Sequence, residues 1–316
     1  MTMARLRSNA GVVLKVLFGA GIFAWMAWSG KLNLAQVGHS LSRWPTMLAI
    51  IGLGYTQVGV MAWRWTLLLQ AQDIRLSFRR TWGLMMIGML FNLAIPGAVG
   101  GDLIKGYYIT RAAAGRKSNA ATSVLMDRVV GLVGLLLLGA AMAAVNLRET
   151  MRSPATRSLG MLTAGGLLAA MAGLYAAVMA GNRLSGWGFL PRVLKNVFGA
   201  LHEYRKRSSV IPKALALSVF NQGVTCGMYY LALRTTGAAR IPAGQFFLIV
   251  PLGLVTTAIP ISPAGIGVGQ AAFFTLFKIV APAYASAGTD AFTAYQVMMI
   301  LLCLSGLYWY VSYKHE

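Results

Sequence analysis

The chain has 316 residues, of which 57% are hydrophobic and only 11% are charged, a composition that excludes a soluble globular domain. A formal net charge of +21 would indicate nucleic-acid binding in a soluble protein, but here the basic residues gather in short connections between apolar segments. We therefore expect a multi-pass membrane protein that does not bind nucleic acid.

Six stretches are apolar and long enough to cross a bilayer, since about 20 helical residues span its hydrocarbon core. The first follows Arg5 and Arg7 and resembles a signal peptide, but its length and the lack of an evident cleavage site favour a retained helix. In chain order, the six predicted spans lie near 10–30, 46–70, 119–145, 158–181, 213–234 and 291–311.

Two further apolar segments, 80–113 and 242–279, are interrupted by clusters of proline and glycine. The clusters are 96–102 and 260–267. Non-helical backbone at bilayer depth persists only where protein or a water-filled cavity satisfies its polar groups. Each segment is therefore predicted to be a broken or re-entrant hairpin of two half-helices, with a binding site near the membrane midplane. Ordinary kinked spans are the alternative.

The basic residues of the connections predict the orientation of the chain. Clusters near 75–80, 111–117 and 182–213 fall on one face if the N-terminus is cytoplasmic. The C-terminus is then cytoplasmic as well, and the two broken hairpins begin on opposite faces. We expect one membrane domain, 1–316, whose halves 1–145 and 146–316 are inverted relative to each other.

Ionisable residues within apolar segments indicate function, because a charge at bilayer depth costs at least ~2.5 kcal/mol. Arg64 lies near the end of a span and is expected to extend to the cytoplasmic interface. We expect Asp102, after the first break, to pair with Arg128 on the third full span. Lys105 is expected to pair with Asp127. A purely structural role in holding the hairpin is the alternative for these pairs.

The glycines of the breaks favour an anion site. Gly100 and Gly101 open a half-helix whose first N–H groups lack partners within the helix, and such an end attracts negative charge. At the second break, Ser262 and Gln270 supply neutral hydrogen-bonding groups. The candidate substrate-binding residues are Asn92, Gly100, Gly101, Asp102, Lys105, Asp127, Arg128, Ser262, Gly265, Gly267 and Gln270.

Three stretches resemble the lysylphosphatidylglycerol synthase transmembrane, or flippase-like domain, family. They are 92–105, 127–132 and 263–270. The resemblance implies a bacterial integral membrane domain that moves lipids or lipid-linked headgroups between leaflets, and some such relatives are associated with hopanoid or lipid-linked sugar pathways. Lys105 stands where this family usually has arginine, and Gln270 where it has glutamate. A mechanism that needs a titrating carboxylate at the second break is therefore not expected.

The expected protein is an all-α lipid translocator of the bacterial cytoplasmic membrane that carries a phosphate-bearing or anionic amphiphile. The chain shows no soluble aminoacyltransferase half, so lysyl transfer and enzymatic activity are not expected. His39, His202 and His315 are far apart, and no nucleotide fingerprint is found, so neither metal nor cofactor is expected.

Two other functions remain open on the sequence. The first is a membrane-embedded enzyme, or an accessory subunit, that modifies a lipid or lipid-linked glycan with Asp102 and Asp127 as acid and base. The second is a secondary transporter of small solutes, which would need an enclosed polar pocket. Access from the lipid phase would distinguish the translocator from the solute transporter.

Overall fold

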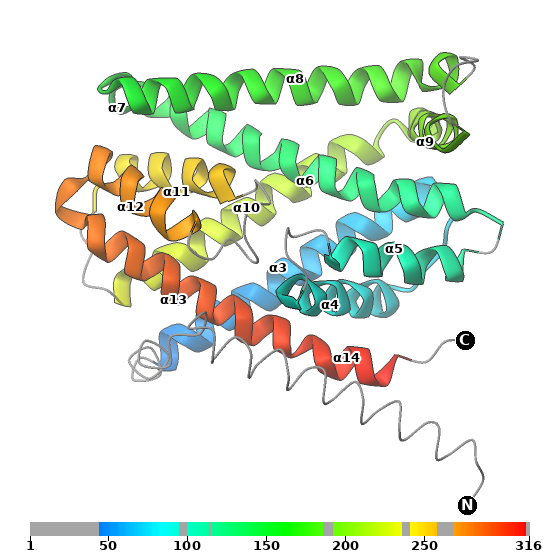
Figure 1. Ribbon diagram of the computed structural model, residues 1–316, viewed down its shortest axis with the longest axis horizontal. Helices are drawn as coiled ribbons and strands as arrows, with labels where there is room; N and C mark the ends of the chain where they lie inside the picture. Colours follow the sequence, from blue (N-terminus) through cyan, green and yellow to red (C-terminus); the bar gives the residue numbers. More distant parts are fainter. Residues whose placement is uncertain are drawn as a thin grey trace, which may run out of the picture.

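The computed structural model describes residues 44–94, 100–113, 115–185, 192–235, 241–257 and 268–313, and within these ranges the regular elements are all helices (Figure 1). The elements are α3 (Trp44–Ala71), α4 (Phe78–Ala94), α5 (Gly100–Ala112), α6 (Lys117–Val145), α7 (Leu147–Met151), α8 (Pro154–Ser185), α9 (Arg192–Glu203), η1 (Tyr204–Arg207), α10 (Val210–Thr235), α11 (Ala243–Thr257), α12 (Val268–Val280), η3 (Pro282–Tyr284), α13 (Ala285–Leu304) and α14 (Gly306–Ser312).

Four helical stretches of the described residues are long and apolar enough to cross a membrane. They overlap four of the predicted spans, and the chain is therefore a multi-pass membrane protein. The predicted span 10–30 lies outside the described residues. The four stretches are Trp44–Ala71, Lys117–Val145, Pro154–Met179 and Pro282–Ser312.

The predicted span 213–234 forms a helix, α10, of 26 residues, but this helix is less apolar than the four others. It packs against α3, α6 and α13 and so lies inside the bundle. Its polar groups find partners there, as where Gln57 of α3 donates a hydrogen bond to Thr225 Oγ1 over 2.7 Å. Gly134 of α6 lies against Ser218 of α10, and a Cβ at that glycine would approach Ser218 Cβ to 2.4 Å.

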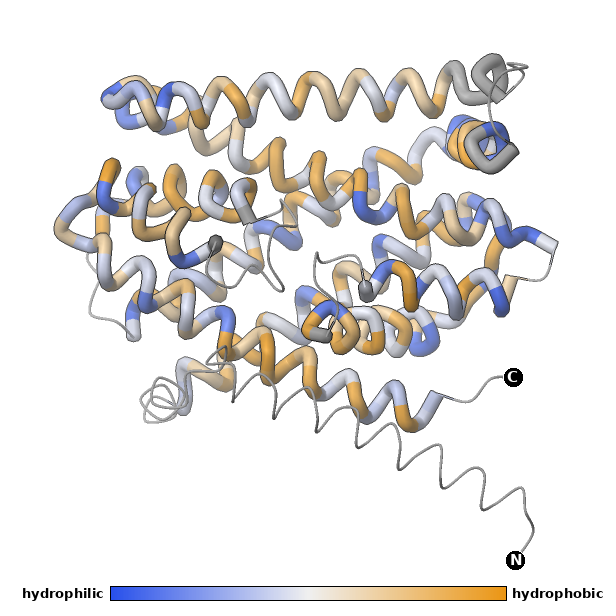
Figure 2. The backbone as a smooth tube through the Cα atoms, viewed as in Figure 1, coloured by the Kyte–Doolittle hydropathy of each residue, from blue (hydrophilic) through white to orange (hydrophobic). Residues whose placement is uncertain are grey.

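Helix α8, in contrast to α10 inside the bundle, runs along the outer edge of the molecule (Figure 1). Large hydrophobic side chains such as Met161, Leu162 and Leu168 are exposed along it. Figure 2 shows hydrophilic positions at the helix ends and also in the middle of the molecule, where α5, α6 and α10 come together. Hydrophilic residues are therefore located within the bundle as well as at its two ends.

Each of the two segments predicted to be broken contains two short helices. Helices α4 and α5 run antiparallel, since Gly88 lies against Gly101 and Met85 lies against Lys105. A Cβ at Gly101 would come within 2.2 Å of the Gly88 carbonyl oxygen, so only glycine permits this approach. Helices α11 and α12 also pack together. The breaks themselves, 95–99 and 258–267, lie outside the described residues.

The short helices cannot cross a bilayer singly. At 1.5 Å per residue, α4 is about 26 Å long and α5 about 20 Å, against a hydrocarbon core of about 30 Å. The pair α4/α5 and the pair α11/α12 lie toward opposite ends of the molecule in Figure 1. Re-entrant insertion from opposite faces stays a prediction.

Candidate functional site

Five charged side chains from three helices form one cluster inside the bundle. Asp127 Oδ1 accepts a hydrogen bond from Arg64 Nε over 2.8 Å, and its Oδ2 lies 3.7 Å from Lys105 Nζ. Lys105 Nζ also lies 2.8 Å from Asp102 Oδ1, and Arg128 Nε donates to Asp102 Oδ2. Both predicted cross-helix pairs, Asp102 with Arg128 and Asp127 with Lys105, are therefore present.

Arg64 was expected at the cytoplasmic interface, and that prediction is wrong. Arg64 is only 4% exposed, and its Nη1 donates to Ser218 Oγ of α10 over 2.8 Å. Its guanidinium also lies against Gly131 of α6, where a Cβ would be 3.4 Å from Nη1. The face of α3 that carries Arg64 packs against α6 and α10, so the side chain is held inside the bundle and does not extend to an interface. No signal in the sequence around Arg64 distinguishes this burial from extension to the interface.

Lys105 is the central member of the cluster. It is 6% exposed, lies between both carboxylates, and has its ammonium 5.4 Å from the centre of the Trp65 ring. A buried ammonium is stable only where carboxylates or π-faces replace water, and this site supplies both. The cluster contains three cations and two carboxylates, and its formal charge is therefore positive.

The start of α5 is partly capped. The Gly101 N–H donates to the side-chain oxygen of Asn92, on α4, over 2.8 Å. One of the helix N-terminal N–H donors expected to attract an anion is thus already used. Asn92 and Gly101 set the position of α5 on α4, and this position brings Asp102 and Lys105 to the cluster.

A cavity of about 470 Å³ borders the cluster. Asn92, Asp102, Lys105, Asp127 and Arg128 line it, and so do Arg64, Asn221, Gln222 and apolar residues such as Met61, Met89 and Leu135. Asn221 is 5% exposed, and its side-chain oxygen has no hydrogen-bond partner among the described residues. The wall therefore combines charge, amide groups and apolar surface, which suits an amphiphile.

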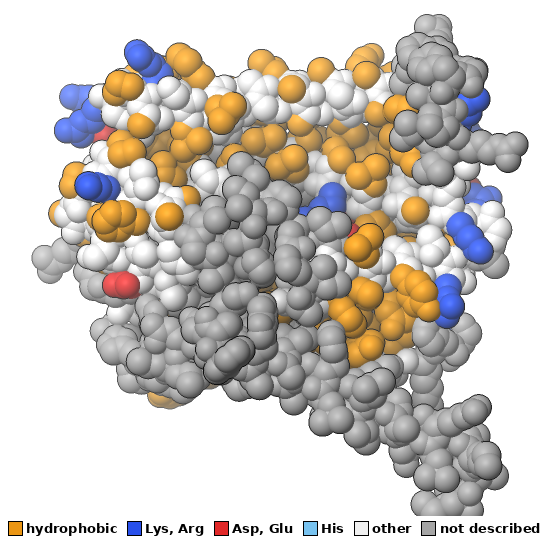
Figure 3. All heavy atoms as spheres, in the orientation of Figure 1, with side chains coloured by type: hydrophobic (Ala, Val, Ile, Leu, Met, Phe, Trp, Pro, Cys, Tyr) orange, Lys and Arg blue, Asp and Glu red, His pale blue; other side chains and the backbone are white. Residues whose placement is uncertain are grey.

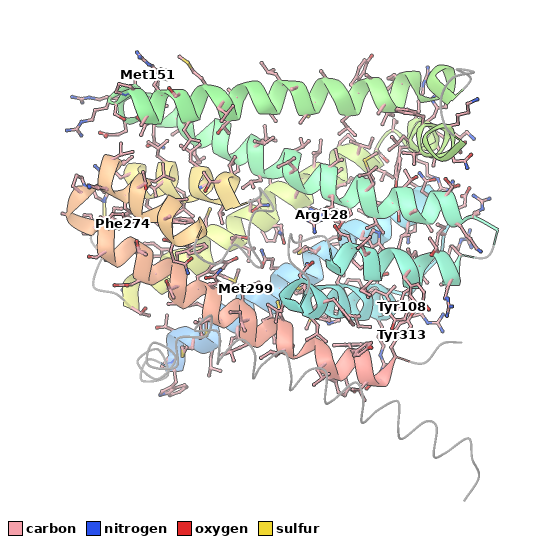
Figure 4. All side chains as sticks on the ribbon, viewed as in Figure 1. Tyr108, Arg128, Met151, Phe274, Met299 and Tyr313 are labelled. Carbon is pink, nitrogen blue, oxygen red and sulfur yellow. The ribbon has the colours of Figure 1, made fainter. Side chains whose placement is uncertain are left out.

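Arg128 lines this cavity, and its side chain is 45% exposed. Figure 4 places Arg128 at the middle of the molecule, and Figure 3 shows basic side chains beside an acidic one at that point of the visible face. Arg128 is residue 12 of α6, so it lies about 17 Å from the start of that helix. A charged group is therefore exposed at the depth where lipid tails would surround the protein.

The residues predicted around the second break are described only in part. Ser262, Gly265 and Gly267 lie outside the described residues. Gln270 is described, and its Nε2 donates to Gln296 Oε1 of α13 over 2.8 Å. Gln270 does not line the cavity, and its binding role stays a prediction.

Comparison with known proteins places the chain in one family. A search of curated proteins found no match, and a search of solved structures found none either. The family model for the lysylphosphatidylglycerol synthase TM region matches residues 12–303, which include the charge cluster and both broken segments. The chain therefore belongs to the lysylphosphatidylglycerol synthase TM region family.

Proposed function

We propose that the protein moves a phosphate-bearing or anionic amphiphile between the two leaflets of the bacterial cytoplasmic membrane. The observation that carries this proposal is the positive cluster at membrane depth, bordered by a cavity of amphiphilic character. Among the described residues the cluster has one more cation than carboxylates, and an anionic headgroup would offset that charge. Membership of a family linked to membrane lipids agrees with this cargo.

Arg128 is the residue proposed to meet the headgroup first. It borders the cavity and is the most exposed member of the cluster. A guanidinium presents five donors in a plane and can hold two phosphate oxygens at once. A phosphate would compete with Asp102 for Arg128 and Lys105, so binding exchanges one set of ion pairs for another.

Acyl chains could remain in the bilayer while the headgroup occupies the cavity, because Arg128 lines the cavity and is also 45% exposed. In this proposal the hairpins α4/α5 and α11/α12 are re-entrant from opposite faces of the membrane. Their motion would change the access of the headgroup to the site. The basic residues near 75–80 and 111–117 lie at the same end of the molecule as α9 (Figure 1), which supports a cytoplasmic location for that end.

The arrangement of the carboxylates supports transport rather than catalysis. Asp127 is held by Arg64 and Lys105, and Asp102 by Lys105 and Arg128. A general base needs a lone pair directed at its substrate. In this cluster the carboxylates instead hold the cations in place.

The test is lipid exchange in liposomes reconstituted with the full chain and a fluorescent phosphatidylglycerol in one leaflet. Arg128→Gln should lower the rate of leaflet exchange about 10-fold or more, as expected when a hydrogen-bonded charge on the ligand is lost. Arg152→Gln is the matched control, since Arg152 is exposed after α7 and away from the cavity. Equal rates for the native chain and Arg128→Gln would reject the proposal, and recovery of chemically altered lipid would support an enzyme.

A further inference from the structure

A second cavity, of about 700 Å³, lies where the start of α4, the end of α5 and the C-terminal helix α14 come together. Arg79 and Arg80 enter it from α4, and Arg111 enters it from α5. It shares no lining residue with the cavity at Arg128. Along α5, Arg111 lies about 9 Å beyond Lys105.

The electrostatics of this second pocket differ from those of the charge cluster. The charged residues that line it are all arginine, and none of the described lining residues is acidic. In the cluster, by contrast, two carboxylates offset most of the positive charge. Several guanidinium groups that converge on one cavity form a site for a polyoxygen anion such as phosphate.

Aromatic side chains form the other walls of the pocket. Tyr108 and Tyr313 meet edge to face, with ring centres 4.8 Å apart, and Figure 4 shows them side by side near the end of α14. Trp309 also lines the cavity, and the Arg111 guanidinium lies 4.6 Å from the centre of the Tyr107 ring. Tyrosine and tryptophan favour the headgroup level of a bilayer, where one part of the ring is apolar and the other is wet.

The surroundings of the pocket can accommodate acyl chains. Phe78, Tyr107 and Tyr308 are exposed around it. In Figure 3, hydrophobic side chains gather over the region of α4 and α5, with Lys or Arg side chains at its outer edge. A phospholipid in the leaflet next to this end of the bundle would place its phosphate at the arginines. Its acyl chains would then lie along the adjacent apolar surface.

We propose that this pocket, lined by Arg79, Arg80 and Arg111, binds the phosphate of an anionic phospholipid at the cytoplasmic interface. The site is separate from the cavity at Arg128, and the proposal holds whether or not the protein translocates lipid. The lipid joins α4, α5 and α14 at the end of the bundle.

The test uses the full chain in phosphatidylcholine nanodiscs titrated with pyrene-labelled phosphatidylglycerol, with binding read by energy transfer from tryptophan. The triple variant Arg79→Gln, Arg80→Gln, Arg111→Gln should weaken binding about 10-fold or more, because each basic group near an anionic lipid contributes to affinity. The matched control, Arg148→Gln, Arg152→Gln, Arg157→Gln, removes the same charge from the other end of the bundle and should change binding less than about twofold, as screening limits distant charges.

A second variant tests the pocket without altering charge. Ala112→Phe places a ring in the cavity, since Ala112 is an exposed lining residue, and it should weaken binding while thermal unfolding stays native. Equal loss of binding in both triple variants would overturn the site in favour of diffuse attraction. Displacement of the label by inorganic phosphate, but not by unlabelled dioctanoyl phosphatidylglycerol, would overturn the assignment to a lipid.

Discussion

The two ends of the charge cluster contain the same residue types at similar depth, yet they differ in burial. At the inner end, Arg64 and Asp127 are almost fully buried and are joined by a hydrogen bond of 2.8 Å. At the outer end, Arg128 is 45% exposed, although its partner Asp102 is largely covered. The buried inner pair joins α3 to α6, whereas we propose that the more exposed outer pair exchanges its partner for a ligand. Burial, rather than residue type, distinguishes the two ends.

The largest expected effect is on stability, at the inner end. Asp127→Asn leaves Arg64 and Lys105 buried beside a neutral amide, and breaking a buried pair in this way costs about 3–5 kcal/mol. We expect a large fall in the thermal unfolding temperature in detergent. Asp290→Asn is the control, because Asp290 is exposed on α13. Unfolding temperatures that fall equally in both variants would contradict the assignment of the inner pair.

The next effect concerns the position of the outer end. Gly101→Ala places a Cβ 2.2 Å from the Gly88 carbonyl oxygen and must push α5 away from α4, at a cost of about 1–3 kcal/mol. Because α5 carries Asp102 and Lys105, lipid exchange should fall as well. Gly106→Ala, on the same helix, adds a Cβ that meets nothing within 4 Å and should lower neither quantity. If Gly101→Ala behaves like Gly106→Ala, the close approach of α4 and α5 is not needed.

A sharper test of the comparison is the effect of the outer pair on stability. Arg128→Gln removes a partly exposed partner, so the unfolding free energy should change by only about 0–1 kcal/mol while lipid exchange falls strongly. Measuring both quantities on one preparation separates the two roles. An unfolding temperature lowered as much as in Asp127→Asn would show that the outer pair is also structural.

The smallest expected effect is at the second broken segment. Gln270→Leu removes the interhelical hydrogen bond to Gln296, and such bonds in membrane proteins contribute about 0.6 kcal/mol on average. Lipid exchange should stay near the native rate, since Gln270 does not line the cavity. A strong loss of exchange would show that the second segment takes part in binding after all.

Much of this arrangement could be predicted from the sequence, and its failures have a physical cause. Helical segments and interruptions follow from hydropathy, proline and glycine, and the two pairs of Asp102 and Asp127 followed from the need of each buried charge for a partner. Arg64 could not be assigned, because extension and burial depend on which face of α3 meets α6 and α10. The hydrogen bond between Asn92 and Gly101 also depends on packing across the break, and no local pattern determines it.

The moderate polarity of α10 has a consequence for how the protein is made. A helix that is less apolar than its neighbours partitions poorly into lipid by itself, and α10 depends on contacts with α3, α6 and α13. Two of these partners, α3 and α6, precede it in the chain and have already left the ribosome when α10 is synthesised. The order of synthesis therefore supplies a protein surface that receives α10 at the translocon, before α13 closes the bundle around it.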